Sequence, residues 1–325
     1  MSKLSVIEVR NLTKKFEKLT AVDSISFGIE QGEVFGLLGP NGAGKTTTLF
    51  MLSTLLKPTS GTALINGFDV TKQPAMVRKS IGIVFQDPSS DDKLTGYENL
   101  WLHAMMYDVP NDKRDIRIKE VLELVDLYDK KDVLVKNYSG GMRRRLELGR
   151  GLLHNPKILF LDEPTLGLDP QTREKLWDYI DKIVKEEKVT VILTTHYMEE
   201  ADKLCNRIAI IDFGKIVVLD NPRNLKKKVG GEIIKVKIKN PDIGAIEGLD
   251  FVKEVKRVDD SVFLTVNDAS KDLQRVLKVI GDVESVELHA PTLNDVFLHY
   301  TGREIREEPP EGGWFQKVSN LRARR

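Results

Sequence analysis

Residues 39–47 read GPNGAGKTT and match the pattern G-x-x-x-x-G-K-[ST] at every fixed position. The apolar stretch before the loop, residues 34–39, is expected to form a strand, and residues 45–56 have the composition of a helix. A glycine-rich loop between a strand and a helix can wrap its N–H groups around a phosphate, and the helix N-terminus adds partial positive charge. The pattern therefore predicts a phosphate-binding loop, with a solvated glycine-rich turn as the alternative.

The residues of this loop have distinct expected tasks. Lys45 should reach the β- and γ-phosphates of a nucleotide, and the Thr46 hydroxyl should bind Mg²⁺. The predicted nucleotide-binding residues are Gly39, Pro40, Asn41, Gly42, Ala43, Gly44, Lys45, Thr46 and Thr47.

Two carboxylates end an apolar run further along the chain, where residues 158–163 read ILFLDE. Successive side chains of a strand point in opposite directions, so Asp162 and Glu163 need not share a task. Asp162 fits the Mg²⁺ shell, through water, and Glu163 fits a general base that polarises the attacking water. Taken alone, such a pair is more often a solvated turn.

Two other polar residues are expected at strand ends. His196 follows VTVILTT, residues 189–195, and Gln86 ends IGIVFQ, residues 81–86. Parallel sheets bind ligands at the carboxyl ends of their strands. His196 could therefore hydrogen-bond the γ-phosphate and the attacking water, and Gln86 could reach Mg²⁺ or that water. A surface histidine and a glutamine without a catalytic role are the alternatives.

A second glycine-containing stretch, YSGGMRRRLELGRG at residues 138–151, leads into a run that favours a helix. Ser139, Gly140 and Gly141 suit a helix N-terminus that accepts an anion. The three arginines at 143–145 are expected to be interface or surface groups rather than direct ligands of the nucleotide.

Strand-like and helix-like segments alternate up to about residue 229, which predicts an α/β domain with a mostly parallel sheet, early antiparallel strands and a helical insert at 94–136. The sequence KKKVGG, residues 226–231, is a plausible linker. The domains expected are a nucleotide-binding domain at 4–229, a small α+β domain at 231–302 and a polar tail at 303–325.

Composition narrows the classes of partner. The net charge of +1 over 325 residues gives no general case for nucleic acid. Because no run reaches the ~18 apolar residues of a membrane span, any membrane-spanning part of a complex is expected to come from another chain. The single cysteine, Cys205, is expected to be buried and unreactive.

The motifs occur in the order phosphate-binding loop, Gln86, Ser139-Gly140-Gly141, Asp162-Glu163, the residues GLD and His196, from residue 4 to about 229. In this order and spacing the chain resembles the nucleotide-binding subunits of ATP-binding cassette (ABC) transporters. The resemblance implies a P-loop ATPase fold, with ATP and Mg²⁺ as cofactors. It also implies that Ser139, Gly140, Gly141 and Met142 of one subunit close over ATP held by the P-loop of another, in a head-to-tail dimer.

Other roles follow from the same resemblance. Phe16 would stack on adenine, with a core position as the alternative. Asp169 would lie at the dimer interface, and Gln86 would sense the membrane partner through the helical insert. The signature reads YSGGM here, whereas LSGGQ is commonest in the family, so one polar side chain near the nucleotide is missing.

The YSGGM signature and the C-terminal sequence PTLNDVFLHYTGRE resemble the daunorubicin-type drug-exporter branch. The expected partners are an integral-membrane permease and a second copy or a homologous subunit, at the cytoplasmic face of the cell membrane. Export of a drug-like, lipid-like or other cargo is expected. The alternative is a soluble ABC ATPase that acts as a mechanical clamp on the ribosome or DNA.

Overall fold

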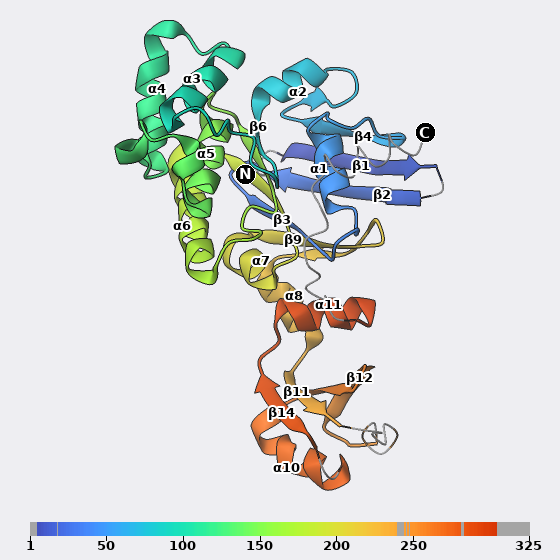
Figure 1. Ribbon diagram of the computed structural model, residues 1–325. Coiled ribbons are helices and arrows are strands. Elements are labelled where there is room, and N and C mark those ends of the chain that lie inside the picture. Colours follow the sequence, from blue (N-terminus) through green and yellow to red (C-terminus); the bar gives the residue numbers. More distant parts are fainter. Residues whose placement is uncertain are drawn as a thin grey trace. The chain divides into compact units, whose positions relative to one another are not determined.

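The computed structural model describes residues 5–17, 19–238, 244, 246, 248–280 and 283–303, so residues 304–325 of the predicted tail lie outside it. The chain forms two compact units that divide between Ile216 and Val217 (Figure 1). This division precedes the predicted linker at 226–231. Residues 226–229 instead complete helix α8 (Pro222–Val229), whose buried Leu225 and Val229 belong to the smaller unit.

A six-stranded sheet has the order β10-β9-β3-β8-β7-β6, and its strands β9, β3, β8, β7 and β6 form the centre of the larger unit. The strands are β3 (Val34–Leu38), β6 (Ile81–Val84), β7 (Ile158–Asp162), β8 (Thr190–Thr195), β9 (Arg207–Asp212) and β10 (Lys215–Asp220). Strand β3 pairs in parallel with β8 and β9, and β7 pairs in parallel with β6 and β8. Every residue of β3, β7 and β8 is buried, as in sheets covered on both faces. The carboxyl ends of these parallel strands therefore meet at one edge.

A second, antiparallel sheet belongs to the same unit and has the order β2-β1-β4-β5. Its strands are β1 (Ser5–Phe16), β2 (Leu19–Glu30), β4 (Ser60–Ile65) and β5 (Phe68–Asp69). The first strand was expected only over residues 6–12. It continues to Phe16, which pairs with Leu19 at the end of the β1–β2 hairpin.

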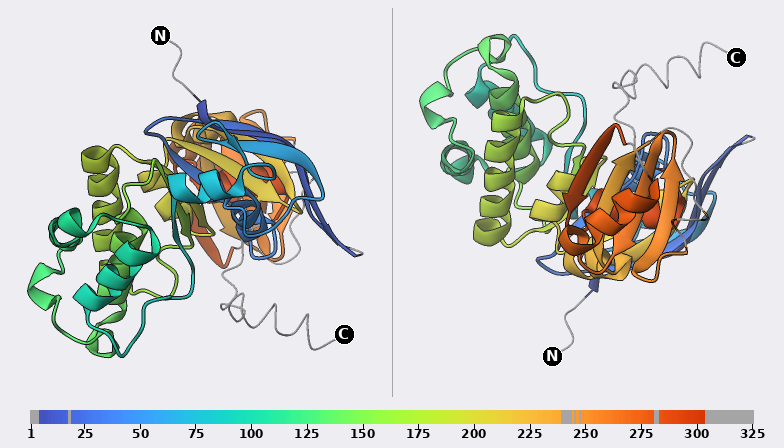
Figure 2. Two further views of the ribbon diagram at one scale, coloured as in Figure 1. Left: turned by 90° about the horizontal axis from the view of Figure 1, so that it is seen from above. Right: turned by 90° about the horizontal axis from the view of Figure 1, so that it is seen from below.

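The helical insert is confirmed between residues 94 and 136. It holds α3 (Gly96–Met106), α4 (Asn111–Leu124) and the short 3₁₀ turns Tyr128–Lys130 and Val135–Asn137. Thr95 and Glu98 form a reciprocal capping box that begins α3. In both views of Figure 2 this insert and the antiparallel sheet lie on opposite sides of the larger unit.

The other helices of the larger unit are α1 (Lys45–Leu52), α2 (Pro74–Ser80), α5 (Gly140–Leu152), α6 (Pro170–Glu187) and α7 (Met198–Leu204). Helix α1 contacts β7 and β8, and α5 contacts β6 and the insert helices α3 and α4. The N-termini of α1 and α5 carry the two glycine-containing stretches of the sequence.

The smaller unit has an antiparallel sheet of order β12-β13-β11-β14, which confirms the expected α+β character. Its elements are β11 (Glu232–Lys237), β12 (Val252–Val258), β13 (Ser261–Val266), α10 (Ala269–Ile280), β14 (Ser285–His289) and α11 (Leu293–Thr301). Val276 of α10 packs with Ile234 and Leu264 of the sheet in a buried core. Helix α11 contacts α8.

Candidate functional site: a phosphate-binding loop and two carboxylates

The glycine-rich loop connects β3 to α1 in the way that the sequence predicts. Gly44 has a φ of 104° and precedes α1, a conformation that a side chain would disfavour. At Gly39 an added Cβ would lie 2.2 Å from the carbonyl oxygen of Ile211. The loop can therefore keep this path only with glycine at both positions.

Lys45 is buried within the loop, with 4% of its surface exposed. Its Nζ donates to the carbonyl oxygens of Gly39 at 2.7 Å and Pro40 at 3.1 Å, and it lies 3.3 Å from Glu163 Oε1. Burial lowers the pKa of Lys45, while the neighbouring carboxylates of Glu163 and Asp162 oppose that shift. The ammonium group thus lies between the loop carbonyl groups and the carboxylate of Glu163.

Asp162, the last residue of β7, faces the start of α1. Its Oδ1 accepts hydrogen bonds from Thr46 Oγ1 at 2.9 Å and from Thr194 Oγ1 at 2.6 Å. Burial raises the pKa of this carboxyl group, although the two hydroxyl donors work in the opposite direction. A hydroxyl and a carboxylate oxygen side by side are the hard oxygen donors that Mg²⁺ prefers, so the residues present fit this ion.

Glu163 follows β7 with a φ of 45°, a left-handed conformation that is uncommon for a residue other than glycine. Its N–H donates to Thr194, at 3.1 Å to the carbonyl oxygen and at 3.0 Å to the hydroxyl. Its Oε2 lies 2.9 Å from His196 Nδ1. Asp162 and Glu163 therefore have different neighbours. Asp162 contacts hydroxyl groups, which suit a metal site, and Glu163 contacts Lys45 and His196.

The protonation of Glu163 reflects these neighbours. Burial by itself would raise its pKa, but the hydrogen bond with His196 and the charge of Lys45 outweigh burial, and the pKa is lowered. The carboxyl group is ionised at neutral pH, which is the state that a general base requires.

The structure corrects one expectation for Gln86 and removes one alternative for Phe16. Gln86 does not end a strand, because β6 stops at Val84. Its carbonyl oxygen lies 3.4 Å from Arg144 Nη1. Phe16 is 40% exposed, so the core alternative is wrong for it. Lys14 Nζ lies over one face of the Phe16 ring, 5.0 Å from its centre.

The second glycine-containing stretch forms the N-terminus of α5. Ser139 is the N-cap, and its hydroxyl accepts from the N–H of Met142 at 3.2 Å. Ser139 and Gly140 are exposed. An added Cβ at Gly141 would lie 2.6 Å from a methyl group of Thr172. Asp169 caps α6 by accepting from Thr172, at 3.0 Å from the N–H and 2.6 Å from the hydroxyl, so it lies in the neighbourhood of the signature.

The arginines at 143–145 do not share one environment, and the surface or interface expectation is wrong for Arg144. Arg143 pairs with Asp92, and Arg145 contacts Asp126. Arg144 is only 6% exposed, so its side chain is buried in the interior of the unit. Helical spacing could have identified it, because Arg144 is four residues before the buried Leu148 and so shares its face.

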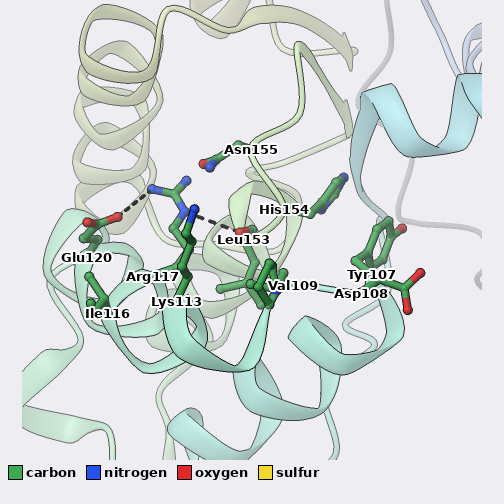
Figure 3. Close-up of a pocket in the computed structure, with 11 residues that line it drawn as sticks. Tyr107, Asp108, Val109, Lys113, Ile116, Arg117, Glu120, Leu153, His154 and Asn155 are labelled. Atoms are coloured by element: carbon green, nitrogen blue, oxygen red, sulfur yellow. Dashed lines mark hydrogen bonds and ion pairs between the residues drawn. The ribbon is translucent and has the colours of Figure 1, made fainter.

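A pocket of about 370 Å³ opens in the helical insert, apart from the predicted site residues (Figure 3). Arg117 of α4 crosses it, donating to the carbonyl oxygen of Leu152 at 2.9 Å and pairing with Glu120 at 3.2 Å. His154 and Tyr107 also line it, with their rings stacked 4.0 Å apart. These contacts join the insert to the end of α5.

Comparison with known proteins supports the same interpretation. Residues 22–166 match the family described as ABC transporter. A daunorubicin resistance ATP-binding protein of Streptomyces coeruleorubidus, DrrA2, is 40% identical over 311 residues, which cover 91% of this chain and 95% of that protein. The chain belongs to the ABC transporter family. It is an ATP-binding subunit that hydrolyses ATP, as both the site and the family indicate.

Further matches extend this assignment to both units. Residues 221–301 match the C-terminal domain of DrrA1-3-like ATP-binding proteins. The Nod factor export ATP-binding protein I of Burkholderia lata is 37% identical and covers 93% of this chain and 98% of that protein. Among solved structures, the dimeric post-hydrolysis state of the ATP-binding cassette MJ0796 with ADP and Pi has a TM-score of 0.59 and 28% identity, covering 66% of this chain and 98% of that one. Within the described ranges of this subunit, no helix has both the length and the apolar character needed to cross a membrane.

Proposed function

We propose that this ATPase subunit dimerises head to tail on ATP, with a second copy or a homologous subunit, and drives export through a separate membrane permease. One observation carries the proposal. The P-loop, the metal-ligand pair and Glu163 gather inside one chain, whereas Ser139 and Gly140 are exposed at the start of α5. The signature helix thus offers its N-terminus outward, where the phosphate of a partner's ATP can reach it.

The chemistry at each site follows from the contacts of Lys45 and Glu163. Phosphate oxygens of ATP attract Lys45, so its ion pair with Glu163, at 3.3 Å here, gives way to contacts with the nucleotide. Glu163 then takes a proton from water as the water oxygen bonds to the γ-phosphorus and the bond to the β-phosphate oxygen breaks. His196, 2.9 Å from Glu163, holds that carboxylate and can also contact the γ-phosphate.

The remaining expected residues complete the site. Thr46 and Asp162, with Gln86, would hold Mg²⁺, which neutralises phosphate charge when bound. Phe16 would stack on adenine, Met142 would lie beside the signature glycines, and Asp169 would lie at the dimer interface. The adjacency of Asp169 to Gly141, through Thr172, supports that last role.

The helical insert supplies a surface for the permease. Trp101, Leu102, Met105 and Met106 of α3 are 40%, 46%, 44% and 70% exposed, and they recur at helical spacing. Exposed apolar side chains gathered in this way mark contact surfaces. The names of the relatives, resistance to daunorubicin and export of Nod factor, favour export as the direction. We place the subunit at the cytoplasmic face of the membrane.

The test is to purify the tagged subunit from membranes and identify what accompanies it. We expect an integral-membrane protein, and we expect Met106→Glu to lose it while ATP binding stays unchanged. Leu288→Glu is the matched control, since Leu288 is also exposed, at 41%, but lies on β14 of the smaller unit. Recovery of ribosomes without any integral-membrane protein would contradict the proposal and favour the clamp alternative.

A further inference from the structure

Arg144 is a buried cation whose partners are main-chain carbonyl groups. The guanidinium donates from Nε to Pro164, from Nη1 to Phe85 and Gln86, and from Nη2 to Asp162 at 3.0 Å and Glu163 at 3.1 Å. These five carbonyl oxygens come from two segments, the one that follows β6 and the one that ends β7. A single side chain of α5 therefore binds both segments that carry predicted catalytic residues.

The guanidinium keeps its charge in this position. Burial lowers the pKa of Arg144 to about 10, and the nearby carboxylates, Glu147 first among them, limit the decrease. The planar group presents five N–H donors in a fixed fork, and this geometry suits several carbonyl oxygens around one point. A lysine has three donors on one nitrogen and cannot span the same set.

Glu147, one turn further along α5, binds the other end of the segment that contains Gln86. Its carboxylate accepts from the N–H groups of Ser89 at 3.1 Å and Ser90 at 2.8 Å, and from the Ser89 hydroxyl at 2.9 Å. Arg150 holds the same carboxylate at 2.9 Å. Arg144 and Glu147 thus attach residues 85–90 to α5 at both ends.

We propose that Arg144 is a positioning residue, which fixes the main chain at Gln86 and Glu163 relative to the signature helix. Ser139 caps α5, and Arg144 lies little more than one turn beyond it, so both move with the same helix. In the proposed head-to-tail dimer, Ser139 completes the partner's ATP site while Glu163 acts on the ATP of its own chain. Arg144 therefore couples closure of the partner's ATP site to the position of Glu163 in the ATP site of its own chain. This coupling rests on the proposed function.

The experiment compares Arg144→Met and Arg144→Lys with the wild-type subunit in steady-state ATP hydrolysis, normalised to the number of ATP-binding sites by titration. A misplacement of about 1 Å at a base costs on the order of 100-fold, which is the loss of kcat expected for Arg144→Met. For Arg144→Lys we expect a smaller but measurable loss of kcat, about three- to ten-fold, since one cation still reaches some of the carbonyl groups. KM for ATP should stay within about two-fold in both, because the P-loop keeps its contacts.

Arg143→Met is the matched control, as Arg143 is the neighbouring arginine on the same helix and pairs with the exposed Asp92. Its kcat should match wild type. Unchanged kcat in both Arg144 variants, or a raised KM with kcat unchanged, would overturn the proposal. If Arg144→Met fails to fold, Arg144→Lys decides: kcat must fall with KM preserved, and wild-type kcat would refute the role. Near-normal turnover of Glu163→Gln would instead refute the proposed base, and the Arg144 series would still report whether the segments need this anchor.

Discussion

The N-termini of α1 and α5 both follow glycines and both suit a phosphate, yet their surroundings differ. At α1, Gly44 provides no side-chain cap, and Lys45 is buried against the loop carbonyls. At α5, Ser139 caps the helix with its own hydroxyl and is exposed. The N-terminus of α1 is lined by groups of its own chain that can bind a phosphate. The N-terminus of α5 is capped by its own serine and is exposed to solvent.

In the proposed head-to-tail dimer, this difference would separate ATP hydrolysis from closure of the dimer. The α1 end lies beside Asp162 and Glu163, the proposed metal ligand and the proposed base. The α5 end contributes a hydroxyl and N–H groups, whose effect depends on what another molecule brings to them. The two ends can therefore be impaired independently, and the predictions below use that independence.

The largest effect is expected at the α1 end. Glu163→Gln removes the base but keeps the size of the side chain, so hydrolysis should fall by about 10²- to 10⁴-fold. ATP binding should persist because Lys45, Thr46 and the loop remain, and the ATP-bound dimer should accumulate in size-exclusion chromatography. Near-normal turnover would remove Glu163 from its role.

A smaller effect is expected in the helical insert, which packs against α5. It should change the stability of the fold and leave the P-loop intact. Burial, with a contribution from Arg150, lowers the pKa of His103 in α3 to about 4, against 6.5 for an unperturbed histidine. The unfolded chain therefore takes up this proton first as the pH falls, and the stability contributed by neutral His103 is lost between about pH 6.5 and pH 4. The loss from pH 7.5 to pH 5 should be about 2 kcal/mol.

The measurement for His103 is urea unfolding at both pH values. His103→Phe keeps a ring beside Tyr107, 4.7 Å away in the wild type, and removes the titration. The variant should lose correspondingly less stability in acid, while its affinity for ATP at neutral pH stays at the wild-type value. An equal acid loss in both proteins would show that His103 is not the group responsible.

The smallest effect is expected at the edge of the nucleotide site. Phe16→Ala should weaken ATP binding by roughly 1 kcal/mol, the size of an aromatic stacking contact. GTP binding should weaken by a similar amount, because stacking reads the face of a ring and not its edge. Fluorescence titration with both nucleotides measures this change. Unchanged affinities would return Phe16 to a structural role in the hairpin.

The sequence predicted the fold well where a local motif lies next to a continuous run of apolar residues. The continuous apolar runs at β3, β7 and β8 predicted a parallel sheet, and the loop at 39–47 predicted which strand leads into α1. It was less informative where tertiary contacts decide. Residues 226–229 looked like part of a linker but end helix α8, because only Leu225 and Val229 mark the buried face of that helix.

The same limit applies to the candidate site. The motifs identified the residues that meet around Lys45, but not the left-handed turn at Glu163 that aims its side chain at Lys45 and His196. That turn depends on hydrogen bonds that the Glu163 N–H donates to a residue of another strand, Thr194. The role of Arg144 was hidden for a similar reason, since its partners are carbonyl groups far along the chain and carry no sequence signal.

The most direct test of the account uses two subunits that are each inactive. Lys45→Ala disables the P-loop, and Ser139→Arg blocks the signature with a side chain that its exposed position can hold, at about 1 kcal/mol for the lost cap. In a mixed dimer, one site combines both lesions. The other joins the intact Lys45 of one chain to the intact Ser139 of its partner.

Differently sized tags and a bifunctional cross-linker report ATP-dependent closure of the mixed pair alone. Neither variant by itself should cross-link with ATP, and the mixture should regain cross-linking at one site in each mixed dimer. If the signature acted within its own chain, every site would carry one lesion and the mixture would stay inactive. A mixture that does not cross-link, with exchange of subunits demonstrated, would contradict the composite site.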